Sequence, residues 1–192
     1  MGKLTGLKKI KTAVFISGTG SNLKNLLKFF KIKKSPISID LVISNIYNAK
    51  GLKYANQFNI KKKTFSFQNV KIAEKNILTL IKKEQIDFIC LAGFMKILSN
   101  DFIRKFNKKI INIHPSLLPK YKGLNTHERA IKNKDKFAGC TVHYVTSKLD
   151  SGKIIMQKKI RITAKDNSIS LAKKVLKQEH KLYPAAIIKI FN

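Results

Sequence analysis

The sequence is poor in cysteine and in acidic residues, and it has no long apolar run. Its two cysteines, Cys90 and Cys140, lie in apolar segments and form no Cys-x-x-Cys pair, a pattern typical of buried thiols in a reducing compartment. The longest apolar stretch, residues 86–98, is interrupted by Asp87 and Lys96 and is shorter than the roughly 18 residues that suggest a membrane span. Residues 1–18 lack the apolar core and cleavage site of a signal peptide. We therefore expect a cytoplasmic protein with no membrane contact.

Acidic side chains are scarce relative to basic ones: 10 Asp and Glu residues stand against 40 Lys and Arg residues, which gives a net charge of +30. A nucleic-acid-binding protein would explain this excess. However, the only arginines are Arg104, Arg129 and Arg161, although arginine suits base reading and phosphate binding best. The lysines are spread along the chain beside abundant Ile and Asn, which all have A/T-rich codons, so codon composition is the simpler explanation. The positive field would still favour an anionic substrate.

The sequence does contain a regular alternation of strand-like and helix-like segments. We predict strands at residues 12–17, 37–45, 62–67, 87–93 and 109–114, and helices at residues 21–32, 49–58, 70–84 and 100–106. In the helix of residues 70–84, the predicted apolar face consists of Ile72, Ile77, Leu80 and Ile81. Such alternation is typical of βαβ units, and it predicts an α/β fold with an open, mostly parallel twisted sheet.

The last part of the chain follows a different pattern. A helix is predicted near residues 126–134, followed by two longer strands at residues 139–146 and 153–162 that we expect to be antiparallel. Residues 170–191 predict a long terminal helix that Pro184 kinks or divides. The chain has 192 residues and no evident linker or repeat, so we expect a single domain over residues 1–192.

A glycine-containing loop, SGTGSN at residues 17–22, lies between the first predicted strand and the first predicted helix. Glycine allows a ligand to approach the backbone closely, and the N-terminus of a helix presents N–H groups and a positive dipole end. These features predict an anion site at Gly20, Ser21 and Asn22. The alternative is a tight turn in which Ser21 or Asn22 caps the helix.

Two polar residues interrupt the predicted strand of residues 109–114. Asn112 and His114 are two residues apart, so their side chains point to the same face of the strand, near the carboxyl end where open parallel sheets bind ligands. A carboxamide can donate to a developing oxyanion while an imidazole moves a proton. Asp150, in a polar loop between the two last strands, would orient the imidazole and raise its pKa. The alternatives are a histidine satisfied by the backbone and an aspartate that only forms a turn.

The other histidines are weaker candidates. His127 lies on a polar helix, His143 alternates along a strand as a core group would, and His180 precedes Pro184. No spacing of His, Cys and Asp indicates a metal site.

Five segments, in this order, give the chain a clear resemblance to the folate-dependent phosphoribosylglycinamide formyltransferases. They are FISGTGSNL at residues 15–23, LAGFMKILS at 91–99, INIHPSLLPKYKG at 111–123, GCTVHYVTSKLDSG at 139–152 and QEHKLYP at 178–184. The resemblance covers nearly the whole chain. It implies a Rossmann-like formyltransferase fold and transfer of the formyl group of 10-formyltetrahydrofolate to the amine of glycinamide ribonucleotide, in purine biosynthesis.

The resemblance also implies roles for individual residues. Asn112, His114 and Asp150 would form the catalytic centre. Gly20, Ser21 and Asn22 would hold the ribonucleotide phosphate, and Glu179 the amino end of that substrate. The folate would lie against Met95, Lys96, Ile97, Leu98 and Asn112, unless Met95, Ile97 and Leu98 only complete the core. No metal is implied, and the partners would be small molecules rather than a specific nucleic acid or a membrane.

Two related families contain similar sequence motifs. Methionyl-tRNA formyltransferases usually continue the signature differently and add a tRNA-binding domain, and formyltetrahydrofolate deformylases usually add an N-terminal regulatory domain. A methionyl-tRNA formyltransferase-like or other nucleic-acid-binding protein is therefore the alternative. Two departures from the family pattern stand out: Asn125 takes the place of a second histidine, and Val70 or Lys71 lies where an arginine near the folate tail is often found.

Overall fold

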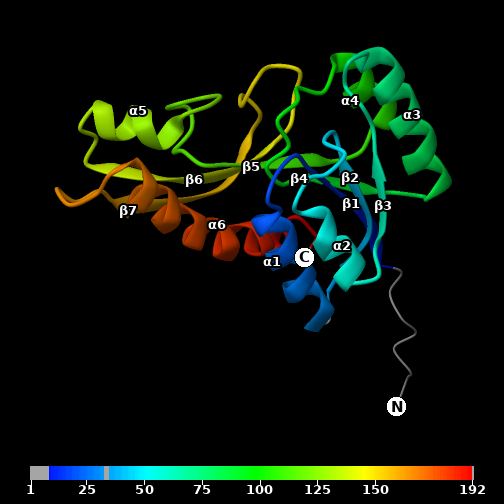
Figure 1. The fold of residues 1–192 in the computed structure, drawn as a ribbon, viewed down its shortest axis with the longest axis horizontal. Coiled ribbons are helices and arrows are strands. Elements are labelled where there is room, and N and C mark those ends of the chain that lie inside the picture. Colours follow the sequence, from blue (N-terminus) through cyan, green and yellow to red (C-terminus); the bar gives the residue numbers. More distant parts are fainter. Residues whose placement is uncertain (1–8, 33–34, 192) are drawn as a thin grey trace. The chain divides into compact units, whose positions relative to one another are not determined.

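A computed structural model describes residues 9–32 and 35–191 (Figure 1). The described residues fall into two compact units. The first consists of residues up to Met95 together with those from Ile187 onward, and the second is Lys96–Ala186.

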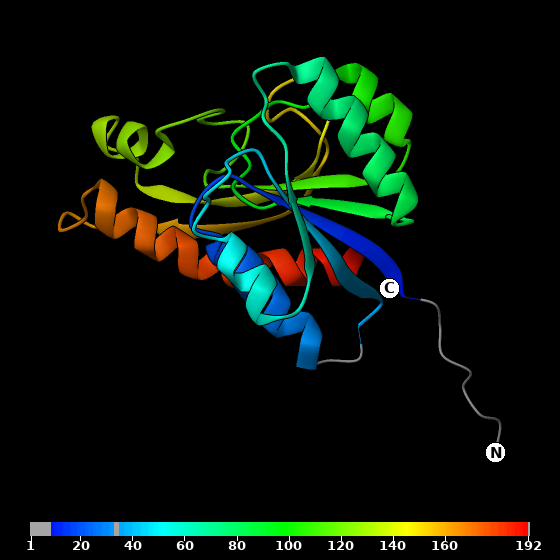
Figure 2. The same ribbon diagram turned by 45° about the vertical axis from the view of Figure 1, so that its right-hand side comes forward.

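The first unit is built on four parallel strands. β1 (Ile10–Ile16), β2 (Ile37–Ser44), β3 (Lys61–Thr64) and β4 (Phe88–Leu91) lie in the order β3-β2-β1-β4. Helices α1 (Ser21–Ile32) and α2 (Leu52–Gln57) cover one face, and α3 (Val70–Lys83) covers the other (Figures 1 and 2). With helices on both faces, β1 and β4 are buried along most of their length, as parallel strands usually are. At the outer strand β3, Lys61, Lys62 and Lys63 are exposed.

Helix α3 has the predicted extent but a different buried face. Its buried residues are Ala73, Glu74, Ile77 and Ile81, whereas the side chain of Ile72 is 58% exposed. The prediction for Ile72 is wrong because five helical residues turn through about 500°, which places Ile72 about 140° away from Ile77.

The second unit contains an antiparallel strand group. α4 (Asn100–Phe106) precedes β5 (Ile110–His114), which pairs antiparallel with β6 (Phe137–Tyr144), and β6 pairs antiparallel with β7 (Ile154–Arg161). α5 (Thr126–Lys132) and α6 (Ser168–Phe191) lie on opposite faces of β6 and β7 (Figures 1 and 2). The predicted antiparallel pair and the long terminal helix are confirmed. α6 continues through Pro184 as one helix, so of the two predicted effects of Pro184 the division of the helix is wrong.

The strand order over the whole sheet is β3-β2-β1-β4-β5-β6-β7. An open, mostly parallel α/β sheet with an antiparallel end is therefore confirmed, in a Rossmann-like arrangement. Within the first unit the direction of strand addition reverses at β1, because β2 lies on one side of it and β4 on the other. Ligands in such sheets bind beyond the carboxyl ends of the strands at this reversal point.

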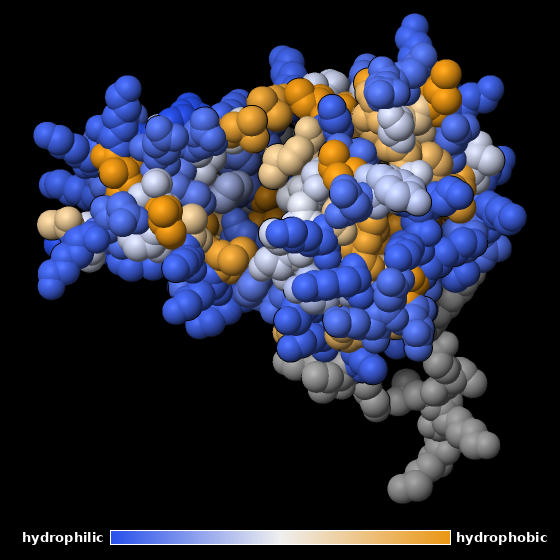
Figure 3. All heavy atoms as spheres, in the orientation of Figure 1, coloured by the Kyte–Doolittle hydropathy of each residue, from blue (hydrophilic) through white to orange (hydrophobic). Residues whose placement is uncertain are grey.

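Hydrophilic side chains predominate on the face drawn in Figure 3. Among the residues that the structure describes, no helix is long and apolar enough to cross a membrane. Cys90 and Cys140 are both buried, and neither forms a disulfide.

Candidate active site

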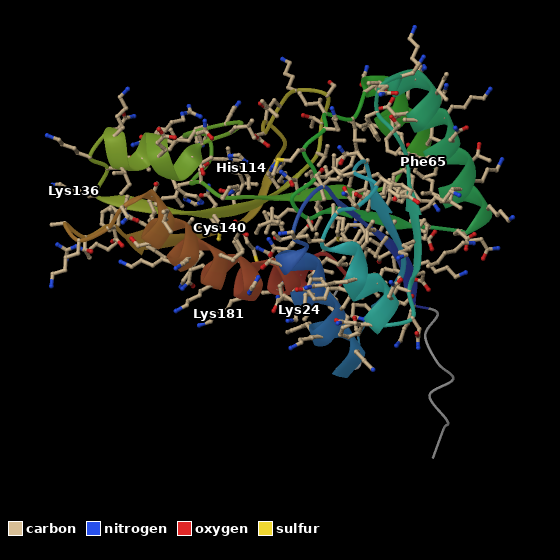
Figure 4. The ribbon with its side chains drawn as sticks, viewed as in Figure 1. Lys24, Phe65, His114, Lys136, Cys140 and Lys181 are labelled. Carbon is tan, nitrogen blue, oxygen red and sulfur yellow. The ribbon has the colours of Figure 1, made fainter. Side chains whose placement is uncertain are left out.

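Strand β5 carries Asn112 and His114, and His114 is its last residue. Their cross-strand neighbours on β6 are His143 and Thr141, respectively. His114 is only 5% exposed and lies near the centre of the view in Figure 4. Thr141 donates from Oγ1 to the Ser116 carbonyl at 2.7 Å, which ties the loop after β5 to β6 and fixes the surroundings of His114.

Both ring nitrogens of His114 face acceptor atoms. Nε2 lies 2.8 Å from the Tyr121 carbonyl oxygen, and Nδ1 lies 3.4 Å from Oδ2 of Asp150. A carbonyl accepts only, so Nε2 carries a proton. In the neutral ring Nδ1 then carries no proton, and a proton taken up there would face the Asp150 carboxylate. The geometry is therefore that of a base whose charged form already has a partner.

The pKa of His114 is lowered overall. Burial lowers it, and this effect exceeds the rise due to the Tyr121 carbonyl and the Asp150 carboxylate. Asp150 raises the pKa of His114 as expected, but burial outweighs this contact because the ring is almost fully desolvated. His114 is thus predominantly neutral near pH 7 and able to accept a proton.

Asp150 lies in the loop after β6, in a left-handed backbone conformation with φ of 44°. Its Oδ2 accepts a hydrogen bond from the Gly123 N–H at 2.9 Å, and its Oδ1 lies 3.6 Å from Nε2 of His143. Burial opposes ionisation, but the contacts with His143, Gly123 and His114 hold the pKa of Asp150 below its ordinary value. These contacts reach beyond its own loop, so Asp150 does more than form a turn.

His143 is a residue of this cluster that the sequence did not single out. It is 2% exposed, and Nδ1 lies 2.9 Å from the Tyr144 carbonyl oxygen, so Nδ1 carries a proton. Nε2 lies 3.3 Å from Nδ2 of Asn112 and also faces Oδ1 of Asp150. The ring of His143 therefore lies between Asn112 and Asp150. Only the cross-strand register of Asn112 and His143 could have predicted it.

The loop SGTGSN lies in the first unit, directly after β1. Ser17 accepts at Oγ from the Met95 N–H at 2.7 Å and donates from its N–H to the Gly93 carbonyl at 3.1 Å. The loops that follow β1 and β4 are therefore bonded together at the reversal point of the sheet.

Gly20 is required at its position by both conformation and space. Its φ is 72°, and a Cβ there would lie 2.5 Å from the Cα of Gly51. The Gly20 carbonyl accepts from the Lys24 N–H at 2.8 Å, and α1 begins at Ser21. Gly20 thus occupies the N-cap position, in place of Ser21 or Asn22, whose N–H groups belong to the first helical turn, where anions bind.

The candidate folate segment contains both exposed and buried side chains. Met95 is 64% exposed and Ile97 60% exposed, whereas Leu98 is 2% exposed. Lys96 is also exposed. Met95 and Ile97 therefore present apolar surface outward, and Leu98 packs in the interior.

Glu179 is a carboxylate on the buried side of α6. It is 7% exposed and shares that side with Leu171, Val175 and Leu182. Burial of the Cys140 thiol and, to a smaller extent, the charge of Glu179 raise the pKa of Cys140 to about 12. The thiol is therefore unreactive near neutral pH.

A cavity of about 450 Å³ opens between the beginnings of α5 and α6, where its lining includes Asn125, His127, Ser168, Lys173 and Leu176. Among the described residues, no group of three or more His, Cys, Asp or Glu side chains could hold a metal ion.

A family model described as formyl transferase matches residues 10–187 of the chain. The chain belongs to the formyl transferase family. Human trifunctional purine biosynthetic protein adenosine-3 is 41% identical over 183 residues, which cover 94% of this chain but 18% of that protein. Phosphoribosylglycinamide formyltransferase of Escherichia coli strain K12 is 39% identical over 177 residues, which cover 91% of this chain and 84% of that protein.

Solved structures of the formyl transferase family share the fold. The crystal structure of phosphoribosylglycinamide formyltransferase from Anaplasma phagocytophilum superimposes with a TM-score of 0.90 at 42% identity, covering 95% of this chain and 87% of the other. The enzyme from Brucella melitensis gives a TM-score of 0.90 at 40% identity, covering 95% and 96%.

Proposed function

We propose that the protein transfers the formyl group of 10-formyltetrahydrofolate to the amino group of glycinamide ribonucleotide, giving formylglycinamide ribonucleotide and tetrahydrofolate in purine biosynthesis. One observation carries this proposal. In a member of the formyl transferase family, a buried neutral imidazole at the end of β5 lies 3.4 Å from a carboxylate and two residues from an asparagine. Proton transfer and oxyanion stabilisation are what acyl transfer to an amine requires.

Asn112, His114 and Asp150 have distinct roles in this reaction. As the amine nitrogen bonds to the formyl carbon, the carbonyl oxygen becomes an oxyanion, and an N–H of Asn112 donates to it. His114 accepts the proton that the amine loses, and the charge that it gains stabilises the oxyanion. When the bond between the carbon and N10 of the folate breaks, that proton passes to N10, which restores the neutral ring. Asp150 orients His114 and stabilises its charged form. No covalent intermediate on the protein is needed.

The ribonucleotide phosphate is assigned to Gly20, Ser21 and Asn22. The close approach of Gly20 to Gly51 and the N-terminus of α1 make a compact site for an anion. Glu179 is assigned to the amino end of this substrate, because a carboxylate accepts hydrogen bonds from the N–H groups of an amine.

The folate is assigned to Met95, Lys96, Ile97 and Leu98, together with Asn112. Met95 and Ile97 expose apolar surface suited to a flat ring system. Leu98 supports the segment from the interior rather than by direct contact, because it is buried. Residues 1–192 are proposed to form one formyltransferase domain, and the cytoplasm is the proposed location because Cys90 and Cys140 form no disulfide.

The test is a formyl-transfer assay with 10-formyltetrahydrofolate and two acceptors supplied separately, glycinamide ribonucleotide and methionyl-tRNA. We expect the ribonucleotide alone to be formylated, and formation of tetrahydrofolate to match it one for one. Formylation of the tRNA instead would refute the proposal and favour the alternative that the net charge of +30 suggests.

A further inference from the structure

Residues 121–125, between β5 and α5, form a loop with an unusual backbone. The left-handed region is occupied at Tyr121, Gly123 and Asn125, with φ of 55°, 77° and 56°. For residues other than glycine this conformation costs roughly 1–2 kcal/mol each. Such a loop needs contacts from outside to hold one conformation.

Two backbone groups of this loop contact the catalytic pair. The Tyr121 carbonyl accepts from Nε2 of His114 at 2.8 Å, and the Gly123 N–H donates to Oδ2 of Asp150 at 2.9 Å. The position of one short loop therefore sets both the tautomer of His114 and the orientation of Asp150.

Arg129, on α5, holds the same loop from its other side. Its Nη1 donates to the Lys122 carbonyl at 2.8 Å and lies 3.4 Å from the Leu124 carbonyl oxygen. Its guanidinium also lies over the Tyr121 ring, 5.0 Å from the ring centroid, an attractive arrangement of cation and ring.

The Lys122 carbonyl and the Gly123 N–H belong to a single peptide group. A trans peptide is planar, and its C=O and N–H point in opposite directions. Arg129 therefore bonds the C=O of the same peptide group whose N–H donates to Asp150. A hydrogen bond from a charged donor to the carbonyl also polarises the peptide and strengthens the bond that its N–H makes.

We infer that Arg129 is a positioning residue of the reaction centre, acting on Asp150 and His114 through the Lys122–Gly123 peptide and the Tyr121 carbonyl. The inference rests on the proposed roles of His114 and Asp150. Arg129 itself touches neither substrate nor the reacting atoms in this scheme. Its loss should therefore lower the rate of the chemical step and leave substrate binding nearly unchanged.

The test compares Arg129→Gln and Arg129→Lys with the unchanged protein, after thermal melting has shown that each variant folds. Arg104→Gln is the matched control, because Arg104 is an exposed helical arginine whose guanidinium pairs with Asp101 at 2.9 Å. We expect kcat to fall by about tenfold or more in Arg129→Gln with KM within about twofold. Arg129→Lys should be equally impaired, because a compact ammonium cannot both bond the Lys122 carbonyl and lie over the Tyr121 ring as the planar guanidinium does.

A second readout needs no activity. In NMR spectra of isotope-labelled protein, the Gly123 amide should exchange with solvent faster and shift upfield in both Arg129 variants, and stay unchanged in Arg104→Gln. A Gly123 amide that is unaltered in a folded Arg129 variant would overturn the inference, as would a normal kcat in Arg129→Gln. Full activity of Arg129→Lys would show that only the positive charge at this position matters, and this result would also overturn the inference. If the unchanged protein transferred no formyl group, the proposed function would fail, and the Gly123 amide would still decide the role of Arg129.

Discussion

Replacing Asp150 with asparagine should move the pKa of His114 further down. The atoms Nδ1 of His114 and Oδ2 of Asp150 are 3.4 Å apart. At that distance the attraction between unit charges is about 1 kcal/mol in a water-like medium and about 5 kcal/mol at an effective dielectric constant of about 20. The two side chains are only 6% and 8% exposed, so we expect an interaction energy between these limits. Loss of this attraction disfavours the charged ring, so the pKa of His114 should fall.

The effect can be measured by NMR titration of the labelled imidazole rings, with His114→Gln used to identify the His114 resonance. The sign follows from the cause: Asp150 favours the charged ring, so its removal favours the neutral ring and lowers the pKa. The same variant should have a kcat about a hundredfold lower, with a much smaller change in substrate binding. Loss of the carboxylate leaves the ring able to accept a proton but without a partner for the resulting charge.

Asp101→Asn serves as the control, because Asp101 is an exposed carboxylate on α4 that pairs with Arg104 and Lys105. It should leave both the His114 titration and kcat unchanged. An unchanged or raised pKa of His114 in Asp150→Asn would contradict the assigned contact, and a nearly normal kcat would contradict its role in catalysis.

Three further predictions concern stability. Leu98→Ala should lower the free energy of unfolding by roughly 2–5 kcal/mol, measured by urea denaturation, whereas the exposed Ile97→Ala should stay within about 0.5 kcal/mol; equal losses would contradict the different burial of the two side chains. Gly20→Ala should destabilise the protein more than Gly93→Ala, because both glycines have positive φ but only Gly20 lies against backbone, and identical melting temperatures would refute the close approach. Burial and the charge of His114 lower the pKa of His127, so the unfolded chain binds a proton at this histidine more tightly than the folded chain does. The free energy of unfolding therefore keeps its full contribution from His127 above the unfolded pKa of about 6.5 and loses it as the pH falls below that value. Between about pH 7 and about pH 5, the melting temperature of His127→Gln should therefore fall less than that of the unchanged protein. An equal fall in both proteins would contradict the lowered pKa of His127.

The elements were largely predictable because each depends on local pattern. The spacing of apolar residues placed α1 at Ser21–Ile32 and α4 at Asn100–Phe106, as the structure has them. Local pattern was insufficient where a tertiary contact decides: Ile72 fits an apolar helix by composition, yet it points outward because Ala73 and Ile77 face the sheet.

The site was predictable only in part, for a similar reason. The residues Asn112, His114 and Asp150 are recognisable by type and position, but their mutual distances depend on the register of β5 and β6 and on the loop of residues 121–125. His143 entered the cluster through that register. The lowered pKa of His114 depends on burial, which the sequence does not give.

The lysines on the outer strands have a consequence for the behaviour of the chain at high concentration. A strand at the end of a sheet offers unpaired backbone groups to which another chain can add. On β3, Lys61, Lys62 and Lys63 are exposed, and on β7, Lys158 and Lys159 are exposed. Two copies that met edge to edge would bring like charges together in pairs, and this repulsion opposes the strand addition that begins aggregation. Part of the large positive charge thus acts as a barrier to self-association, independently of any substrate.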